Sequence, residues 1–319
     1  MTDMASPPRD GRAPRRIFLG IGICSVGILM MEILLTRIFS FTVWYHLAYL
    51  TISTALLGFG AAGSILSAYP RLIEKGVSKL AGSCSAAAGL TLIAAVAILG
   101  QNPLEPNRVL IEPVSFSFGL LGYYVAITIP FFLGGVAVAA PLSAHPAEVN
   151  RLYAADLLGA GVGCIAAVAA LAAGDGAAAV FVCAAVLVAA GAVYSSGRRI
   201  AYAFAALAVA LAVAAPSAKH VLEFTPVATK EVGRALAQPE TEMLFTRWSP
   251  VNRVDLYRKK NPKAALWTSW GLEKGFDGPL PEVISIQYDG HNGSSVYHVI
   301  DDDTMQFLDT LAPTTTSTI

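Results

Sequence analysis

Residues 17–39 read IFLGIGICSVGILMMEILLTRIF, and this nearly uninterrupted apolar run decides the fold. A helix needs about 20 apolar residues to cross a bilayer, because each residue advances it by about 1.5 Å. Only two charged residues, Glu32 and Arg37, interrupt the run. We therefore predict a membrane-spanning helix, since a helix satisfies its own backbone hydrogen bonds inside lipid.

Six further apolar stretches follow before residue 216. The chain has 319 residues, of which 14% are charged, against about 25% in soluble domains. The sequence predicts a mainly α-helical polytopic bundle of about seven helices, followed by a small β-rich extramembrane module. The seven predicted spans are residues 17–39, 43–69, 80–100, 116–143, 153–173, 177–194 and 200–215. The last is the shortest, so six or eight spans remain open as alternatives.

Three parts are expected along the chain: a basic tail at residues 1–16, the bundle at residues 17–215 and the module at residues 216–319. The basic tail followed by an apolar run also fits a signal peptide. However, the run is longer than a signal peptide needs, and no small-residue cleavage site follows it. We therefore expect a retained first helix.

Basic residues predict the orientation, because short cytoplasmic loops are enriched in Lys and Arg. With the N-terminus in the cytoplasm, the opposite loops hold only Arg37 and Arg108. We therefore expect a multi-pass protein of the cell inner membrane with a cytoplasmic N-terminus. The residues on the cytoplasmic side would be Arg9, Arg12, Arg15, Arg16, Arg71, Lys75, Lys79, Arg151, Arg198 and Arg199.

Four ionisable residues fall inside or at the ends of predicted spans, where charges are costly and often functional. They are Glu32, Arg37, His46 and Asp156. One interpretation is that the four converge as an intramembrane polar cluster lining a path for a small molecule. In the other, His46 belongs to an interfacial aromatic belt and Asp156 is an N-terminal charge that favours the helix dipole.

Small residues recur at a spacing of four, which lets helix backbones approach closely. The pairs are Gly159/Gly163, Gly58/Ala62 and Gly60/Ser64. Helix packing is the expected role, with a functional hinge as the alternative. No internal repeat with paired broken helices, the usual mark of a transporter, is evident.

The four cysteines all lie inside predicted spans and form no CxxC pair, so no zinc or redox site is predicted. They are Cys24, Cys84, Cys164 and Cys183. The formal net charge is zero, which gives no reason to expect nucleic acid as a partner. The expected partner is the lipid bilayer.

Residues 216–319 change in character. Residues 247–257 and 282–288 alternate in the manner of strands, and the second run ends in the turn signal Asp289-Gly290. We predict four to six strands, with a strand at residues 294–300 and short helices at residues 229–237 and 304–311. Trp248, Trp267 and Trp270 are expected in the core or at the membrane. The module contains no glycine-rich nucleotide loop and no catalytic signature such as HExxH.

Three segments together resemble a known family. They are VWYHLAY at residues 43–49 with STALLGFG at residues 53–60, RLYAADLLGAGVG at residues 151–163, and RWSPVNRVD at residues 247–255. They resemble the bacterial membrane proteins that are fused to a spermidine-synthase-like, or polyamine aminopropyltransferase-like, domain. The resemblance covers nearly the whole chain in order.

The resemblance implies that a multi-helix membrane region precedes a small β-domain and then a Rossmann-like half. In the family, that half binds decarboxylated S-adenosylmethionine or S-adenosylmethionine through a glycine-rich loop. Asp289-Gly290 is similar to the turn that borders the polyamine pocket, so Asp289 is a candidate pocket residue. The chain lacks the glycine-rich loop. We therefore expect no cofactor and no catalysis in this chain alone, and a separate or downstream Rossmann-like domain as a partner.

The number of spans bears directly on this chemistry. The cofactor is cytosolic, yet seven helices with a cytoplasmic N-terminus place residues 216–319 outside. Three hypotheses follow: a membrane-anchored spermidine-synthase-like protein, a small-molecule transporter or channel, and a structural or sensory membrane protein whose module binds a partner.

Overall fold

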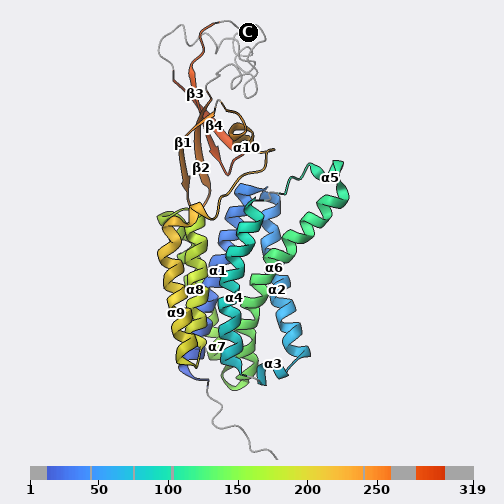
Figure 1. The fold of residues 1–319 in the computed structure, drawn as a ribbon, viewed down its shortest axis with the longest axis vertical. Helices are drawn as coiled ribbons and strands as arrows, with labels where there is room; N and C mark the ends of the chain where they lie inside the picture. The colour runs from blue at the N-terminus through green and yellow to red at the C-terminus, as the bar shows by residue number, and fades with distance from the viewer. Residues whose placement is uncertain are drawn as a thin grey trace, which may run out of the picture. The chain divides into compact units, whose positions relative to one another are not determined.

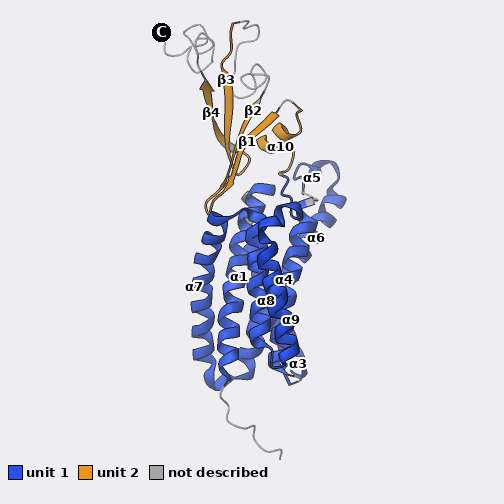
Figure 2. Ribbon diagram, turned by 60° about the vertical axis from the view of Figure 1, so that its left-hand side comes forward, with its two compact units in different colours: residues 1–225 blue, residues 226–319 orange. Residues whose placement is uncertain are grey.

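The structure is a computed structural model that describes residues 13–43, 45–74, 76–101, 104–239, 241–259 and 278–298. Its contacts divide the chain into two compact units, unit 1 at Met1–Thr225 and unit 2 at Pro226–Ile319 (Figure 2). The division falls ten residues after the boundary expected at residue 215, because η2 (Ala215–His220) packs on α8 (Gly176–Tyr194) within unit 1.

Unit 1 is helical (Figure 1). Among the described residues, seven helices are long and apolar enough to cross a membrane, which agrees with the predicted number. They are α1 (Arg15–Thr42), α2 (Tyr45–Ala68), α4 (Val77–Gln101), α6 (Pro113–Ala144), α7 (Val149–Ala173), α8 and α9 (Arg198–Ala214). Short helical turns α3 (Arg71–Glu74), α5 (Arg108–Ile111) and η1 (Pro146–Glu148) join them.

Pairs of contacting residues give the helix directions. Gly22 and Val26 on α1 face Gly159 and Gly163 on α7 in the same order, so α1 and α7 run parallel. Gly82 and Gly89 on α4 face Gly191 and Ala184 on α8 in reverse order, so these helices are antiparallel. Gly58 and Ala62 on α2 face Phe132 and Gly135 on α6 in the same order, so these two helices are parallel. All three relations are those expected of helices that alternate in direction along the chain, as they would if each crossed a bilayer.

An odd number of alternating helices brings the two ends of unit 1 to opposite ends of the bundle. At the amino end, the backbone N–H of Ala13 donates to Glu148 Oε2 at 2.7 Å, just before α7 begins. At the far end, the carbonyl of Glu223 would lie 2.9 Å from a Cβ built on Gly100, near the end of α4. The chain thus leaves the bundle at the end opposite to the one where α1 begins.

The predicted small-residue pairs behave differently. A Cβ built on Gly163 would lie 2.6 Å from the carbonyl oxygen of Val26, so the Gly159/Gly163 pair packs backbone on backbone against α1. The Gly58/Ala62 pair packs against α6, where a Cβ on Gly58 would lie 2.7 Å from Phe132 N. The prediction for Gly60 and Ser64 is wrong: both are exposed, and the Ser64 hydroxyl donates to Gly60 O within α2.

Helix α6 continues through Pro130 and Pro141. Its residues before Pro130 are mostly exposed, whereas Gly134–Val138 are buried in the bundle. Figure 1 shows this first part of α6, after α5, leaning away from the other helices. A proline inside a helix removes one backbone hydrogen bond and favours a bend, which agrees with the change at Pro130.

In unit 2, the described residues form α10 (Glu231–Leu236) and a four-stranded antiparallel sheet in the order β1-β2-β3-β4. The short helix predicted at residues 229–237 is confirmed as α10. The predicted strand at residues 294–300 corresponds to β4. The strands are β1 (Thr241–Trp248), β2 (Arg253–Lys259), β3 (Glu282–Tyr288) and β4 (Asn292–His298).

Residues 247–257, expected to begin a strand, form the end of β1, a turn and most of β2. In the turn, the Ser249 hydroxyl donates to the Asn252 carbonyl at 2.8 Å, and Trp248 pairs with Arg253 in the register. Trp248 is buried, as predicted. Prolines and short polar residues favour such turns, which explains why the alternation is interrupted here.

Several predictions lie outside the described residues. These are the roles of Trp267 and Trp270, the helix at residues 304–311 and the basic tail up to residue 12. They stay predictions.

Candidate functional site

Polar side chains connect neighbouring helices in unit 1 and neighbouring strands in unit 2. In unit 1 they join α1 and α7. The Ser25 hydroxyl, almost fully buried, lies within hydrogen-bonding distance of Asp156 Oδ1 and of Ile21 O, the latter at 2.9 Å. A hydroxyl has one proton, so Ser25 can donate to only one of these oxygens at a time.

The interpretation of Asp156 as an N-terminal helix charge is wrong. Helix α7 begins at Val149, four residues before the predicted start, and has no acidic residue in its first turn. Asp156 therefore lies two turns inside the helix, where the dipole has little effect on a side chain. Its described hydrogen bond is to Ser25 on the neighbouring helix.

The other three predicted residues are placed as follows. Glu32 is half-buried on α1, seven residues after Ser25 and thus two turns further on. Arg37 is also half-buried on α1. His46 lies in the first turn of α2, and its side chain is outside the described part of the structure. Convergence of all four residues therefore stays a prediction.

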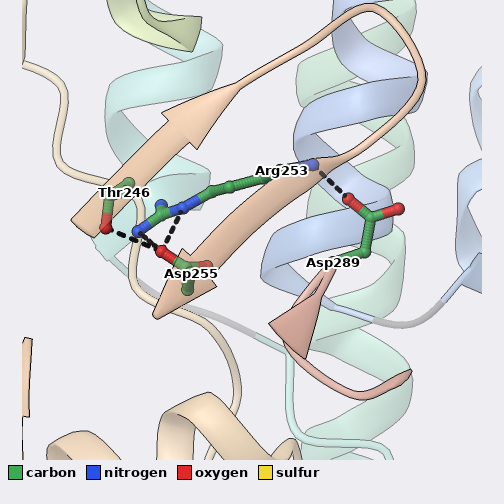
Figure 3. Close-up of polar contacts among 4 residues, drawn as sticks. All are labelled: Thr246, Arg253, Asp255 and Asp289. Atoms are coloured by element: carbon green, nitrogen blue, oxygen red, sulfur yellow. Dashed lines mark hydrogen bonds and ion pairs between the residues drawn. The ribbon is translucent and has the colours of Figure 1, made fainter. Parts of the chain in front are cut away.

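In unit 2 the polar residues join β1, β2 and the turn after β3 (Figure 3). Arg253 and Asp255 on β2 form an ion pair at 2.9 Å, and Thr246 on β1 donates to the same carboxylate oxygen at 2.8 Å. The Arg253 guanidinium also lies over the Trp248 ring, 5.4 Å from its centre. We call Thr246, Arg253, Asp255 and Asp289 the clasp.

The clasp contains a buried charge. Asp255 is completely buried, and the guanidinium side chain of Arg253 is 12% exposed. Asp255 Oδ2 has no hydrogen-bond partner among the described residues. A buried carboxylate needs a nearby cation, because taking an isolated charge out of water costs several kcal/mol. Arg253 thus supplies the positive charge that the buried Asp255 carboxylate needs beside it.

Asp289 connects the second hairpin to the first. It has a positive φ of 49°, and Gly290 follows with a φ of 75°, as a tight turn between β3 and β4 requires. The Asp289 carboxylate accepts from the backbone N–H of Arg253 at 2.9 Å, and the N–H of Asp289 donates to the Arg253 carbonyl at 2.8 Å (Figure 3). The turn predicted at Asp289-Gly290 is confirmed, and its carboxylate holds the start of β2.

Lys230, which precedes α10, is also buried beside this turn. Its ammonium donates to the Asp289 carbonyl at 2.8 Å. Burial lowers the pKa of Lys230 to about 8, and the negative charge of Asp289 opposes that shift. The sequence offered little sign of Lys230, Thr246 or Ser25 in these roles, because each is a common residue without a distinctive pattern.

The geometry assigns the clasp a structural role first. It holds one neutralised ion pair and a turn, without a pair of groups arranged for proton transfer or nucleophilic attack. Within the described residues, no group of three His, Cys, Asp or Glu side chains could hold a metal ion.

Comparisons of the chain with protein-family models, with curated proteins and with solved structures found no match in any of the three. Its function must therefore be argued from its own residues.

Proposed function

We propose that this chain is a multi-pass protein of the cell inner membrane with a cytoplasmic N-terminus, in which seven helices anchor a spermidine-synthase-like β-module. The observation that carries the membrane part is the bundle of seven long apolar helices that alternate in direction. Its amino end holds Arg15, Arg16 and Arg151, in keeping with the expected enrichment of cytoplasmic loops in basic residues.

The module's likeness to spermidine synthases rests on residues 247–255 and on the Asp289-Gly290 turn. These two segments are adjacent in unit 2, where the Asp289 carboxylate holds the backbone of Arg253. The two segments that carry the resemblance are therefore in direct contact. On this proposal Asp289 borders a site for a polyamine. A cofactor of the S-adenosylmethionine type would bind a separate or downstream Rossmann-like domain, and this chain alone would transfer no group.

Seven spans with a cytoplasmic N-terminus would place residues 226–319 outside the cytoplasm. Reporter fusions after Ser196 and after Thr225 test this placement. We expect a reporter that is active only in the periplasm to work after Thr225 and to fail after Ser196. The reverse result would refute the proposed orientation, and equal activity at both sites would refute a seventh span.

Binding of spermidine to the purified chain tests the module separately. Asp289→Asn keeps an oxygen acceptor for Arg253 N–H and a residue that tolerates positive φ, but removes the charge. We expect spermidine to bind the wild-type chain and to bind this variant about tenfold more weakly, because the attraction between a carboxylate and an ammonium group is lost. If the wild-type chain does not bind spermidine, the polyamine part of the proposal is wrong. The proposed membrane topology would be unaffected by that result.

Transport of a small molecule is the second candidate, and the contact between Ser25 and Asp156 favours it. Ionisable residues inside membrane helices commonly mark substrate or proton paths. If transport is the function, Asp156→Asn and Glu32→Gln should abolish substrate uptake at unchanged expression. Uptake equal to that of the wild-type chain would make both residues structural.

A further inference from the structure

Unit 1 contains a cavity whose lining includes none of Ser25, Glu32 and Asp156. It has a volume of about 600 Å³ and lies between the end of α4, the segment that leads into α5, and the first part of α6. Ligand sites commonly enclose about 300–1,000 Å³, so the cavity is large enough for a bound molecule. Its apolar lining includes Ile98, Leu99, Leu104, Phe116, Tyr123 and Ala126.

The cavity exists because α6 diverges from α4 while remaining attached to it. The Tyr123 hydroxyl donates to the Leu99 carbonyl and accepts from the Leu104 N–H, both at 3.1 Å, which ties α6 to the end of α4. Gly119 and Gly122 line the cavity without side chains. A Cβ added at Gly122 would meet no atom within 4 Å, so the space beside it is open.

The chemistry of the lining changes along α6. Glu105, Arg108 and Ser115 lie at the far end of the bundle, where α6 begins, and apolar residues extend from there to Ala126. Ser115 and Ala126 are eleven positions apart, which corresponds to about 16 Å along a helix. The hydrocarbon core is roughly 30 Å thick, and one lipid chain fills half of it. The lining is therefore about as long as one lipid chain.

The polar end carries both signs of charge. Arg108 is exposed and offers a guanidinium, which suits a phosphate group. Glu105, three residues earlier, offers a carboxylate, which suits an ammonium group. Leu110 and Phe118, which flank this end of the bundle, are 86% and 71% exposed. Such apolar exposure is expected of a surface that faces lipid.

We propose that this cavity binds a phospholipid with a phosphoethanolamine headgroup. One acyl chain lies between α4 and α6, the phosphate contacts Arg108, and the ammonium contacts Glu105. The site is independent of the proposed spermidine-synthase-like function, because every residue that forms it belongs to unit 1.

Native mass spectrometry of the full chain in detergent tests this site with three probes. They are dioleoyl phosphatidylethanolamine, dioleoyl phosphatidylglycerol and dioleoylglycerol, which share their acyl chains and differ in the headgroup. We expect one phosphatidylethanolamine to be retained, about fivefold more than either other lipid, as fits partly exposed ion pairs. Equal retention of all three lipids would show only a general lipid coat and would overturn the proposal.

Two pairs of variants make the test specific. Gly122→Leu places a side chain in the space for the acyl chain and should lower retention about tenfold, whereas Gly161→Leu adds the same side chain in open space on α7 and should change nothing. Arg108→Gln is exposed and should leave the fold intact, yet it should reduce phosphatidylethanolamine to the level of dioleoylglycerol. Arg199→Gln, at the other end of the bundle, is its control. Unchanged retention in Arg108→Gln would refute the headgroup assignment even if Gly122→Leu failed to fold.

Discussion

The seam between α1 and α7 and the hairpin of β1 and β2 hold their segments together with opposite chemistry. At the seam, backbone meets backbone through Gly159 and Gly163, with one hydrogen bond from Ser25 to Asp156. In the hairpin, Thr246 on β1 donates to the buried Asp255 on β2, which forms an ion pair with Arg253 on the same strand. Helices in lipid gain little from hydrophobic burial and depend on close packing, whereas a small module can include charge if each charge is paired.

The largest expected effect concerns the seam. Gly159→Leu places a side chain against the Gly22 carbonyl on α1, where backbone leaves no room. We expect a loss of about 3 kcal/mol or more in the free energy of unfolding, because overpacking forces two helices apart. The measurement is the fraction of folded, monodisperse protein in detergent. Gly161→Leu is the control, and equal effects of the two variants would show that the seam does not depend on close approach.

The second effect concerns the clasp. Arg253→Met removes the cation beside fully buried Asp255, and we expect unit 2 to lose about 3–5 kcal/mol of stability. Hydrogen exchange of β2 and β3 peptides in the full chain measures this loss. Arg258→Met, whose ion-pair partners are Glu242 and Glu282 and whose side chain is 38% exposed, should cost less than about 1 kcal/mol. If the two variants exchange at the same rate, burial does not determine how much an ion pair contributes to the stability of unit 2.

A smaller effect is expected for the polar contact within the seam. Ser25→Ala removes the hydroxyl beside Asp156, and hydrogen bonds between membrane helices contribute about 0.6 kcal/mol on average. Unfolding in a denaturing detergent compares this variant with Ser64→Ala, whose hydroxyl contacts only its own helix at Gly60. A loss above about 2 kcal/mol for Ser25→Ala would mean that the seam depends on polar contacts as much as the clasp does.

A pH dependence is expected for unit 2. The pKa of Lys230 is about 8 in the folded chain and 10.5 ordinarily, so the unfolded chain binds more protons between these values. The cost of burying the ammonium is fully present below pH 8, and stability should rise from pH 8 toward pH 10. Above that, Tyr257 and Tyr297, whose pKa values are raised by burial, should reverse the trend. Hydrogen exchange of β3 should show the rise, and Lys230→Met should abolish it.

Burial in the sheet shows how far alternation alone can mislead. In β3 the buried residues are Val283, Ser285 and Gln287, while Ile284 and Ile286 on the other face are only partly buried. Hydrophobicity would have favoured the isoleucines as the core face. The buried polar side chains have partners from elsewhere: Gln287 donates to Glu231 at 2.7 Å, and Ser285 pairs with Tyr257 across the strands. Such partners are visible only once α10 and β2 are in place.

The sequence by itself determined the seven long helices, the hairpin turn at Asp289-Gly290 and the short helix α10. Each depends on residues that are close in the chain: a long apolar run forms its own hydrogen bonds in lipid, and an Asp-Gly pair tolerates positive φ. The tertiary structure alone decided that Ser25 meets Asp156, 131 residues away, and that Gly163 packs closely while Gly60 does not. These contacts depend on how each helix is rotated about its own axis against its neighbours. The seven long helices are apolar on most of their faces, so their apolar pattern does not indicate which face packs on which neighbour.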